Sequence, residues 1–277
     1  MHLGDTLGGY VFYDEAMNER LDAPRYVDTG DVPADVFSPS SRILEINSKS
    51  GLYPLYVAYN IYRTRLDNDK TSFTISEEAV EKRRLQHLSI WDDVLKENLF
   101  IVCKTPMARN ITKRTLAGFR GTKVKTHCFD DLINQITNKK ENFISKVTSG
   151  SFWGLTDIKD MKFNAIVGNT PYQIVNKGDG TGADPIYHLF IDIAGKLGSI
   201  STLIHPARFL FNAGKTPKEW NQKILNDVHF RVASYYPNST SVFPSVDIKG
   251  GIAVTMYDNR NTYKKIGLFS AHPELSS

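Results

Sequence analysis

The sequence has few cysteines and no long apolar run. Its 277 residues include 2 cysteines, Cys103 and Cys128, each in or beside a strand-like segment, which favours reduced core thiols over a disulfide framework. No apolar stretch is long enough to span a bilayer, and the N-terminus has neither the basic nor the apolar part of a signal peptide. We therefore expect a cytoplasmic protein that does not contact a membrane.

Clustered metal ligands, a large net charge and a phosphate-binding loop are also missing. The 7 histidines are scattered, so we predict no metal site. With 34 Lys and Arg against 30 Asp and Glu, the net charge of +4 is compatible with a polyanionic partner but too small to argue for one. The glycine-bearing segment 176–184 lacks the Gly-Lys-Ser/Thr ending of a P-loop, which argues against nucleotide hydrolysis.

What the chain does have is 41% hydrophobic residues, arranged as strands that alternate with helices. Strands are expected at 42–47, 99–103, 123–129, 165–168, 201–204, 232–236 and 252–257, and helices at 52–62, 107–116, 132–139, 187–197 and 218–227. This alternation predicts an α/β fold with a mostly parallel, doubly wound, seven-stranded sheet. The last two strands are joined by a loop without a helix, which favours an antiparallel hairpin at the edge.

The composition divides the chain into three parts. Residues 1–40 are polar and rich in turn residues, so we expect an irregular approach to the fold. Residues 41–260 form the main domain, with a charged helical insertion at about 66–97. Residues 261–277 are a C-terminal tail.

Polar residues follow the first four predicted strands, at 47–51, 104–105, 130–131 and 169–172. In a doubly wound sheet, ligands bind at the carboxyl ends of the strands, near the point where the strand order reverses. The sequence therefore predicts a binding site made from these four segments. His205 ends the fifth strand at the same edge, and we interpret it as a structural histidine.

The segment Asn169-Thr170-Pro171-Tyr172 carries the clearest chemistry. An exocyclic amine such as adenine N6 is a poor nucleophile, and two acceptors on its N–H bonds help it turn towards tetrahedral geometry. The side-chain oxygen of Asn169 and the carbonyl of Thr170 are the acceptors we predict. Pro171 fixes the turn by locking φ, and Tyr172 stacks on a base swung out of its helix. The alternative is an ordinary Asx-type turn at a strand end.

The stretch 163–172 resembles motif IV, the Asn-Pro-Pro-Tyr catalytic motif of N6-adenine DNA methyltransferases. More narrowly, the chain resembles the Eco57I-like methylases of restriction-modification systems, with supporting stretches at 43–53, 234–239 and 242–251 in the family's order. The resemblance implies a Rossmann-like, S-adenosylmethionine-dependent methyltransferase domain over 41–260. It also implies methylation of adenine N6 in DNA.

The resemblance further implies cofactor contacts in the first strand-to-helix turn. Glu45 matches the acidic residue that ends the first strand of motif I, Gly51 its last glycine and Tyr53 its phenylalanine. With Asn47 and Ser48 of the same loop, they are expected to contact S-adenosylmethionine, mainly its amino-acid part. The alternative role of Glu45 is that of a helix-capping acid.

Two further matches concern adenine rings. Asp130, with Asp131 beside it, resembles the motif III acid that accepts from the cofactor's adenine amine; the alternative is an N-cap pair for the next helix. Phe243 matches the aromatic residue of motif VIII beside the target base, or else belongs to the core.

Three departures from the family pattern favour a second hypothesis. Lys49 stands where motif I has its first glycine, so close approach of the cofactor requires an uncommon φ at Lys49 or a displaced loop. Lys104 stands where the family usually has an acid for the ribose hydroxyls, and Thr170 replaces the first proline of motif IV. The second hypothesis is a non-catalytic methyltransferase-fold subunit that binds DNA or scaffolds a restriction-modification complex.

A third possibility, N-methylation of glutamine in a protein, fits less well with the matches at 234–251. Family members usually continue into a target-recognition domain that reads bases in the grooves, and we expect no such domain in residues 261–277. We therefore expect DNA and a target-recognition or endonuclease subunit or domain as partners.

Overall fold

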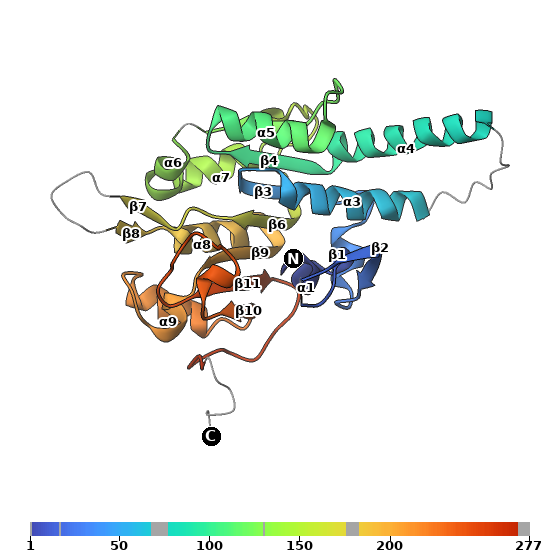
Figure 1. The fold of residues 1–277 in the computed structure, drawn as a ribbon. Helices are drawn as coiled ribbons and strands as arrows, with labels where there is room; N and C mark the ends of the chain where they lie inside the picture. Colours follow the sequence, from blue (N-terminus) through green and yellow to red (C-terminus); the bar gives the residue numbers. More distant parts are fainter. Residues whose placement is uncertain (1, 17, 68–76, 130, 176–182, 271–277) are drawn as a thin grey trace.

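The fold is built on a central sheet of seven strands in the order β10-β11-β9-β6-β3-β4-β5 (Figure 1). The computed structural model describes residues 2–16, 18–67, 77–129, 131–175 and 183–270. Pairing is parallel from β9 to β5, and β11 is antiparallel to both of its neighbours. The strands are β3 (Ile43–Ser48), β4 (Leu99–Cys103), β5 (Lys125–Cys128), β6 (Phe163–Asn169), β9 (Gly198–Pro206), β10 (Phe230–Tyr236) and β11 (Ile252–Asp258). The predicted seven-stranded sheet with an antiparallel edge hairpin is confirmed.

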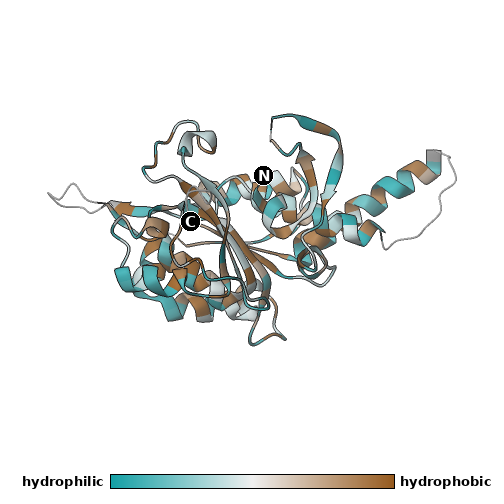
Figure 2. Cartoon of the chain, turned by 90° about the horizontal axis from the view of Figure 1, so that it is seen from below, coloured by the Kyte–Doolittle hydropathy of each residue, from teal (hydrophilic) through white to brown (hydrophobic). Residues whose placement is uncertain are grey.

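Helices cover both faces of this sheet. Along β3, Leu44 and Ile46 belong to one buried cluster and Ile43 to the other, as expected when side chains alternate across a strand. The first cluster includes residues of α6 (Leu132–Asn138), α7 (Lys140–Thr148), α8 (Tyr187–Leu197) and α9 (Lys218–Leu225). The second includes residues of α1 (His2–Leu7), α2 (Val32–Val36), α3 (Leu52–Asp67), α4 (Glu77–Glu97) and α5 (Pro106–Ala117). Figure 2 shows apolar residues concentrated on the central strands and polar ones on the outer helix faces.

The central strands are long apolar runs because both of their faces are covered. Every residue of β3 and of β4 is buried. β3 is followed by α3 and α4, which return the chain to β4 on one side, while β6 lies on the other side of β3. The strand order therefore reverses between β3 and β6, and the crevice of a doubly wound sheet opens at their carboxyl ends.

The N-terminal forty residues are more regular than predicted. They contain α1, a hairpin of β1 (Gly9–Tyr13) and β2 (Arg20–Val27), and α2. The hairpin is held by α3, because the backbone N–H of Tyr10 donates to Asn60 Oδ1 (2.5 Å) and the hydroxyl of Tyr56 donates to Gly8 O (2.7 Å). The expectation of an irregular segment was wrong because these partners lie about fifty residues away along the chain.

The remaining elements are short or lie between the predicted ones. The charged segment 66–97 does carry a helix, α4, which contacts α3 along the crossover from β3 to β4. The sequence missed α7 and the small hairpin of β7 (Gln173–Val175) and β8 (Ala183–Pro185). Three 3₁₀ turns complete the fold, η1 (Gly150–Trp153), η2 (Arg208–Phe211) and η3 (Ser239–Ser241). Most of the glycine-bearing segment 176–184 lies outside the described residues.

Residues 261–270 of the C-terminal tail are bonded to the end of α9 and to the segment between α9 and β10. Tyr263 N donates to Val228 O (2.6 Å) and Gly267 N to Leu225 O (2.9 Å). In the described ranges, no helix combines the length and the apolar character needed to cross a bilayer.

Candidate active site

The two segments with the strongest functional signal end on adjacent parallel strands. β3 and β6 pair in register up to Glu45 opposite Val167. Gly168 then lets the strands approach closely, because a Cβ at this position would lie 2.6 Å from the carbonyl oxygen of Ile46. The motif I loop after β3 and the Asn169 segment after β6 therefore lie side by side.

Beyond the last paired residues of β3 and β6, a side-chain hydrogen bond joins the two segments in place of main-chain hydrogen bonds. Asn47 has a left-handed backbone (φ 69°) and is 3% exposed, and its Nδ2 donates to the carbonyl oxygen of Asn169 (2.8 Å). The sequence placed Asn47 among the cofactor contacts. In the structure, its amide holds the main chain of the 169–172 segment.

The acceptor atoms predicted for the target amine are buried. Thr170 is 1% exposed, and Asn169 Oδ1 and Thr170 Oγ1 have no hydrogen-bond partner within the part of the chain that the structure describes. A buried, unpaired amide oxygen costs about 1–3 kcal/mol, which a donor from a ligand would recover. Pro171, in a trans peptide, follows directly and is half-buried.

Three of the predicted aromatic residues meet beside this segment. Tyr172, Phe243 and Tyr53 all pack against one small buried cluster, formed by Ile204, Ile252 and Val254. The ring centroids of Tyr172 and Phe243 are 6.5 Å apart at 59°. Burial raises the pKa of Tyr172, and its hydroxyl has no partner among the described residues. The two half-buried rings can contact a planar base from two directions.

Glu45 is a buried acid below the motif I loop. It is 3% exposed, and its Oε2 has no hydrogen-bond partner in the described ranges. Burial raises the pKa of Glu45 to about 8, against the opposing effects of a hydrogen bond with Ser48 and the charge of Lys49. A cationic group brought next to this carboxyl would be stabilised strongly, because little solvent screens the pair.

The rest of the loop is fixed against α5. Ser48 Oγ lies 2.9 Å from Thr112 Oγ1. Gly51 has φ 77°, and a Cβ there would lie 3.0 Å from Thr112 Cα, so only glycine fits. The left-handed residues are thus Asn47 and Gly51, and Lys49 needs no uncommon φ. Of the two options that the sequence left for Lys49, the structure excludes the uncommon φ.

Lys49 and Lys104 are exposed residues at the same strand ends. Partial burial lowers the pKa of Lys49; the charge of Lys104 acts in the same direction, whereas Glu45 opposes it. Two positively charged side chains therefore lie at the carboxyl ends of β3 and β4.

The predicted motif III pair is only partly described. Asp130 lies outside the described residues. Asp131 is exposed and precedes α6, where its Oδ2 accepts from Asn134 Nδ2 (2.6 Å) without capping a backbone N–H. It stands beyond the end of β5, separated from β3 by β4.

His205 is a structural histidine, as predicted. It is fully buried, with Nδ1 3.1 Å from Pro206 O and Nε2 2.7 Å from Thr255 Oγ1. The carbonyl requires a proton on Nδ1, so Nε2 accepts from the threonine. Burial lowers the pKa of His205 to about 4, which keeps the ring neutral.

One neighbour of the site was not found from the sequence. The ring of His2, in α1, lies 5.2 Å from that of Tyr53, and α1 is tied to β9 by a hydrogen bond from Thr202 Oγ1 to Thr6 Oγ1 (3.1 Å). No local pattern marks His2, because the contact joins the first helix to β9 and α3.

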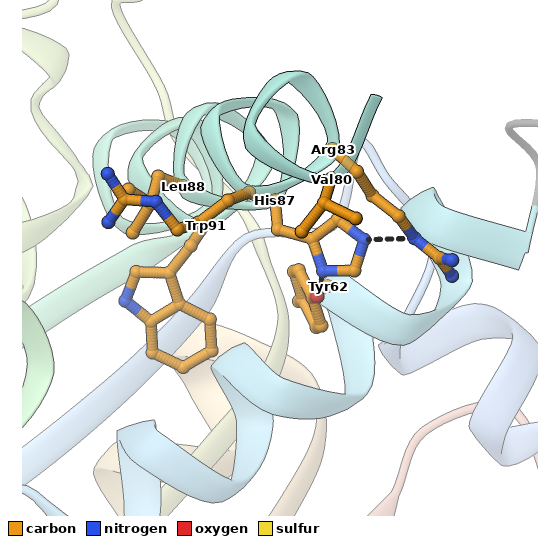
Figure 3. A pocket seen from close by; sticks show the side chains of 7 residues that line it. Tyr62, Val80, Arg83, His87, Leu88 and Trp91 are labelled. Carbon is orange, nitrogen blue, oxygen red and sulfur yellow. Dashed lines mark hydrogen bonds between the residues drawn. The ribbon is translucent and has the colours of Figure 1, made fainter. Parts of the chain in front are cut away.

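A groove of about 500 Å³ lies elsewhere, between α3 and α4 (Figure 3). Within it, Tyr62 Oη lies 2.7 Å from His87 Nδ1, and Arg83 Nε donates to His87 Nε2 (3.4 Å). Tyr62 is nine residues beyond Tyr53 along α3, and none of the predicted site residues lines this groove. Its lining residues are Tyr62, Val80, Arg83, Arg84, His87, Leu88 and Trp91.

The sheet order, the crevice at the reversal point and the polar strand ends define a Rossmann-like fold of the S-adenosylmethionine-dependent methyltransferase class. The model of the family described as Eco57I restriction-modification methylase matches residues 97–243, more than half of the chain. The chain belongs to this family, as the motifs predicted.

Similar proteins include a Mycoplasma pneumoniae protein described as an uncharacterized adenine-specific methylase, which is 27% identical over 143 residues. The match covers 44% of this chain and 33% of that protein, so the chain spans about a third of the length of this curated relative.

Solved structures with a similar fold include a modification subunit of a putative type I restriction enzyme from Vibrio vulnificus YJ016 (12% identity, TM-score 0.48, covering 82% of this chain and 43% of that one). Another is a nuclease-deletion mutant of the Type ISP restriction-modification enzyme LlaGI in complex with a DNA substrate mimic. Its values are 12% identity and a TM-score of 0.48, covering 82% of this chain and 21% of that one.

Proposed function

We propose that this chain methylates adenine N6 in DNA, with S-adenosylmethionine as the methyl donor, as part of a restriction-modification system. The observation that carries the proposal is the buried, unpaired Oδ1 of Asn169 at the carboxyl end of β6, beside the point where the strand order reverses. An acceptor held in that position suits an amine with two N–H bonds. The membership in the methylase family supports the same reaction.

In the proposed reaction, the adenine is flipped out of the helix and stacks against Tyr172, with Phe243 beside that ring. Asn169 Oδ1 accepts from one N–H of the amine and the carbonyl of Thr170 accepts from the other, which turns the lone pair towards the donor. Bound S-adenosylmethionine supplies the electrophilic methyl group. No strong base is needed, because the proton leaves after the nitrogen has become cationic.

The residues of the motif I loop fit the amino-acid part of that cofactor. The unpaired Oε2 of Glu45 suits its ammonium group, and the packing of Gly51 against α5 fixes the turn that carries this acid. Because Glu45 is protonated more easily than an exposed acid, binding of the cation would drive its ionisation. Ser48 and Tyr53 lie at the same turn, and Asp130 and Asp131 are proposed for the adenine end.

The experiment is a methyl-transfer assay with labelled S-adenosylmethionine on unmethylated DNA of mixed sequence, followed by identification of the methylated base. We expect N6-methyladenine, and a loss of about 10²–10³-fold in kcat for Asn169→Ala, by analogy with the removal of one acceptor or donor from a preorganised site. Asn169→Asp keeps the acceptor oxygen and serves as the matched control. Equal rates for Asn169→Ala and the wild type would exclude the proposed clamp.

The second candidate is a non-catalytic subunit that binds DNA or scaffolds a restriction-modification complex. Lys49 and Lys104, both exposed at the cofactor end, favour it because they place positive charge where the family has a glycine and an acid. Equilibrium binding of S-adenosylhomocysteine separates the two candidates, because the scaffold needs no cofactor. In both cases we propose a target-recognition or endonuclease subunit or domain as partner, in keeping with the limited share of its relative that the chain spans.

A further inference from the structure

Arg208 lies at the same sheet edge as the proposed amine clamp. β9 runs parallel to β6, with Asn169 opposite Ile204, and ends at Pro206. Arg208 opens the 3₁₀ turn η2 two residues later. Arg208 therefore lies just past the carboxyl end of β9, at the edge of the sheet where Asn169 ends β6.

Two glycines enclose the stem of this arginine. A Cβ at Gly250 (φ 86°) would lie 2.7 Å from Arg208 Cγ, and one at Gly214 (φ 84°) would lie 3.3 Å from Arg208 Cβ. Arg208 Nε donates to the carbonyl oxygen of Lys249 (2.6 Å). The side chain is thus held in one conformation, which reduces the entropy that binding would otherwise cost.

The part of the chain that the structure describes places no carboxylate against Arg208. Among the described residues, no carboxylate oxygen lies within 4.0 Å of its guanidinium, and the residue is exposed. With Nε used by Lys249, the two Nη groups, which have no hydrogen-bond partner among the described residues, remain as a fork of N–H donors. A fixed fork of this kind suits the paired oxygens of a phosphate.

The same contacts join Arg208 to the segment that carries Phe243. Besides the bond to Lys249, Ala207 N donates to Gly251 O (3.0 Å). The segment 239–251 is also bonded internally, through Ser239 Oγ, which donates to Val246 O (2.9 Å) and accepts from Ile248 N (2.7 Å). A phosphate on Arg208 would be held at a constant position relative to the aromatic wall of the base pocket.

We propose that Arg208 binds a backbone phosphate of the DNA strand next to the flipped adenine. The contact positions the strand and carries no sequence information. This inference rests on the proposed function, since it takes DNA as the substrate.

The test is a salt titration of duplex DNA binding, followed by fluorescence anisotropy from about 50 to 200 mM salt. Arg208→Gln is expected to lower the slope of log K against log salt by about 0.9, the value for one phosphate contact, and to weaken binding roughly tenfold for every sequence tried. Arg84→Gln is the matched control, because Arg84 lies on α4 and pairs with Glu81. It should leave the slope unchanged.

Gly250→Ala gives a second variant without any change of charge. Its Cβ displaces the Arg208 stem, so we expect a fall in slope close to that of Arg208→Gln. Thermal unfolding confirms that each variant is folded. If the wild type binds DNA and Arg208→Gln leaves the salt slope unchanged, the phosphate contact alone is overturned. If the wild type binds no DNA at the lowest salt, both the contact and the DNA methylation proposal are overturned.

Discussion

The pH dependence of stability offers a sharp test of the buried acid at the cofactor end. Burial raises the pKa of Glu45 from 4.5 to about 8, so the folded protein keeps a proton that the unfolded chain releases between these values. Stability from this group is therefore fully present below about pH 4.5 and is lost as the pH rises to about 8. The difference of about 3.5 pKa units corresponds to about 5 kcal/mol.

Glu45→Gln removes this loss, because the amide cannot ionise. We expect equal melting temperatures for the variant and the wild type at pH 5, and a variant that melts roughly 10 °C higher at pH 9. Differential scanning fluorimetry across pH 5–9 measures both curves. Glu141→Gln is the control, since Glu141 is an exposed residue paired with Lys196, and its curve should follow the wild type.

The same variant tests the role of Glu45 as a ligand. S-adenosylhomocysteine should raise the melting temperature of the wild type at pH 7 and fail to do so for Glu45→Gln, because the variant cannot provide the negative charge that the ammonium group requires. Calorimetric titration in two buffers of different ionisation enthalpy should show proton release on binding. If the melting temperatures of Glu45→Gln and the wild type differ by the same amount at every pH from 5 to 9, the assignment of a buried, protonated acid is refuted.

Three further predictions concern the loop and the strands beside Glu45. Asn47→Gly keeps the left-handed backbone but removes the hydrogen bond to Asn169. We expect kcat to fall about 10–100-fold while the Kd of S-adenosylhomocysteine changes less than about threefold. Equal changes in kcat and Kd would contradict a positioning role for Asn47. Lys104→Asp restores the family's acid and should tighten binding of S-adenosylhomocysteine about tenfold by calorimetry. Gly168→Ala forces a Cβ against Ile46 O and should destabilise the fold by about 1–3 kcal/mol in urea unfolding, whereas an unchanged midpoint would argue against the close strand approach.

The core of the fold could be predicted because its signals are local. The apolar run 99–103 is buried on both faces, and the structure gives β4 those same bounds. The amphipathic segment 187–197 likewise became α8 with unchanged ends. In α1, by contrast, only Leu3 and Leu7 supply a hydrophobic pattern. α7 follows α6 so closely that its three large apolar residues, Phe143, Ile144 and Val147, gave no separate signal.

Part of the candidate site could likewise be predicted from the sequence, and part could not. Topology alone brings the ends of β3 and β6 together, so Glu45 and Asn169 could be placed from the order of the elements. The bond from Asn47 to Asn169 could not be foreseen, because it depends on where the β3–β6 ladder stops. The glycine enclosure of Arg208 depends on the return of residues 249–251 to the end of β9, which the sequence does not reveal.

The backbone geometry of the loop after β3 explains how Lys49 can stand where the family's motif I has its first glycine. A lysine in place of the first glycine would be strained if the left-handed turn stayed at that position. Here the left-handed residue is Asn47, two positions earlier, and asparagine tolerates this conformation better than most residues do. Its side chain then reaches Asn169, and the chain continues past an exposed Lys49 to Gly51 against α5. The loop therefore accommodates Lys49 with an ordinary φ and fixes the 169–172 segment at the same time, so it is a consistent geometry that can still present Glu45 to a cation.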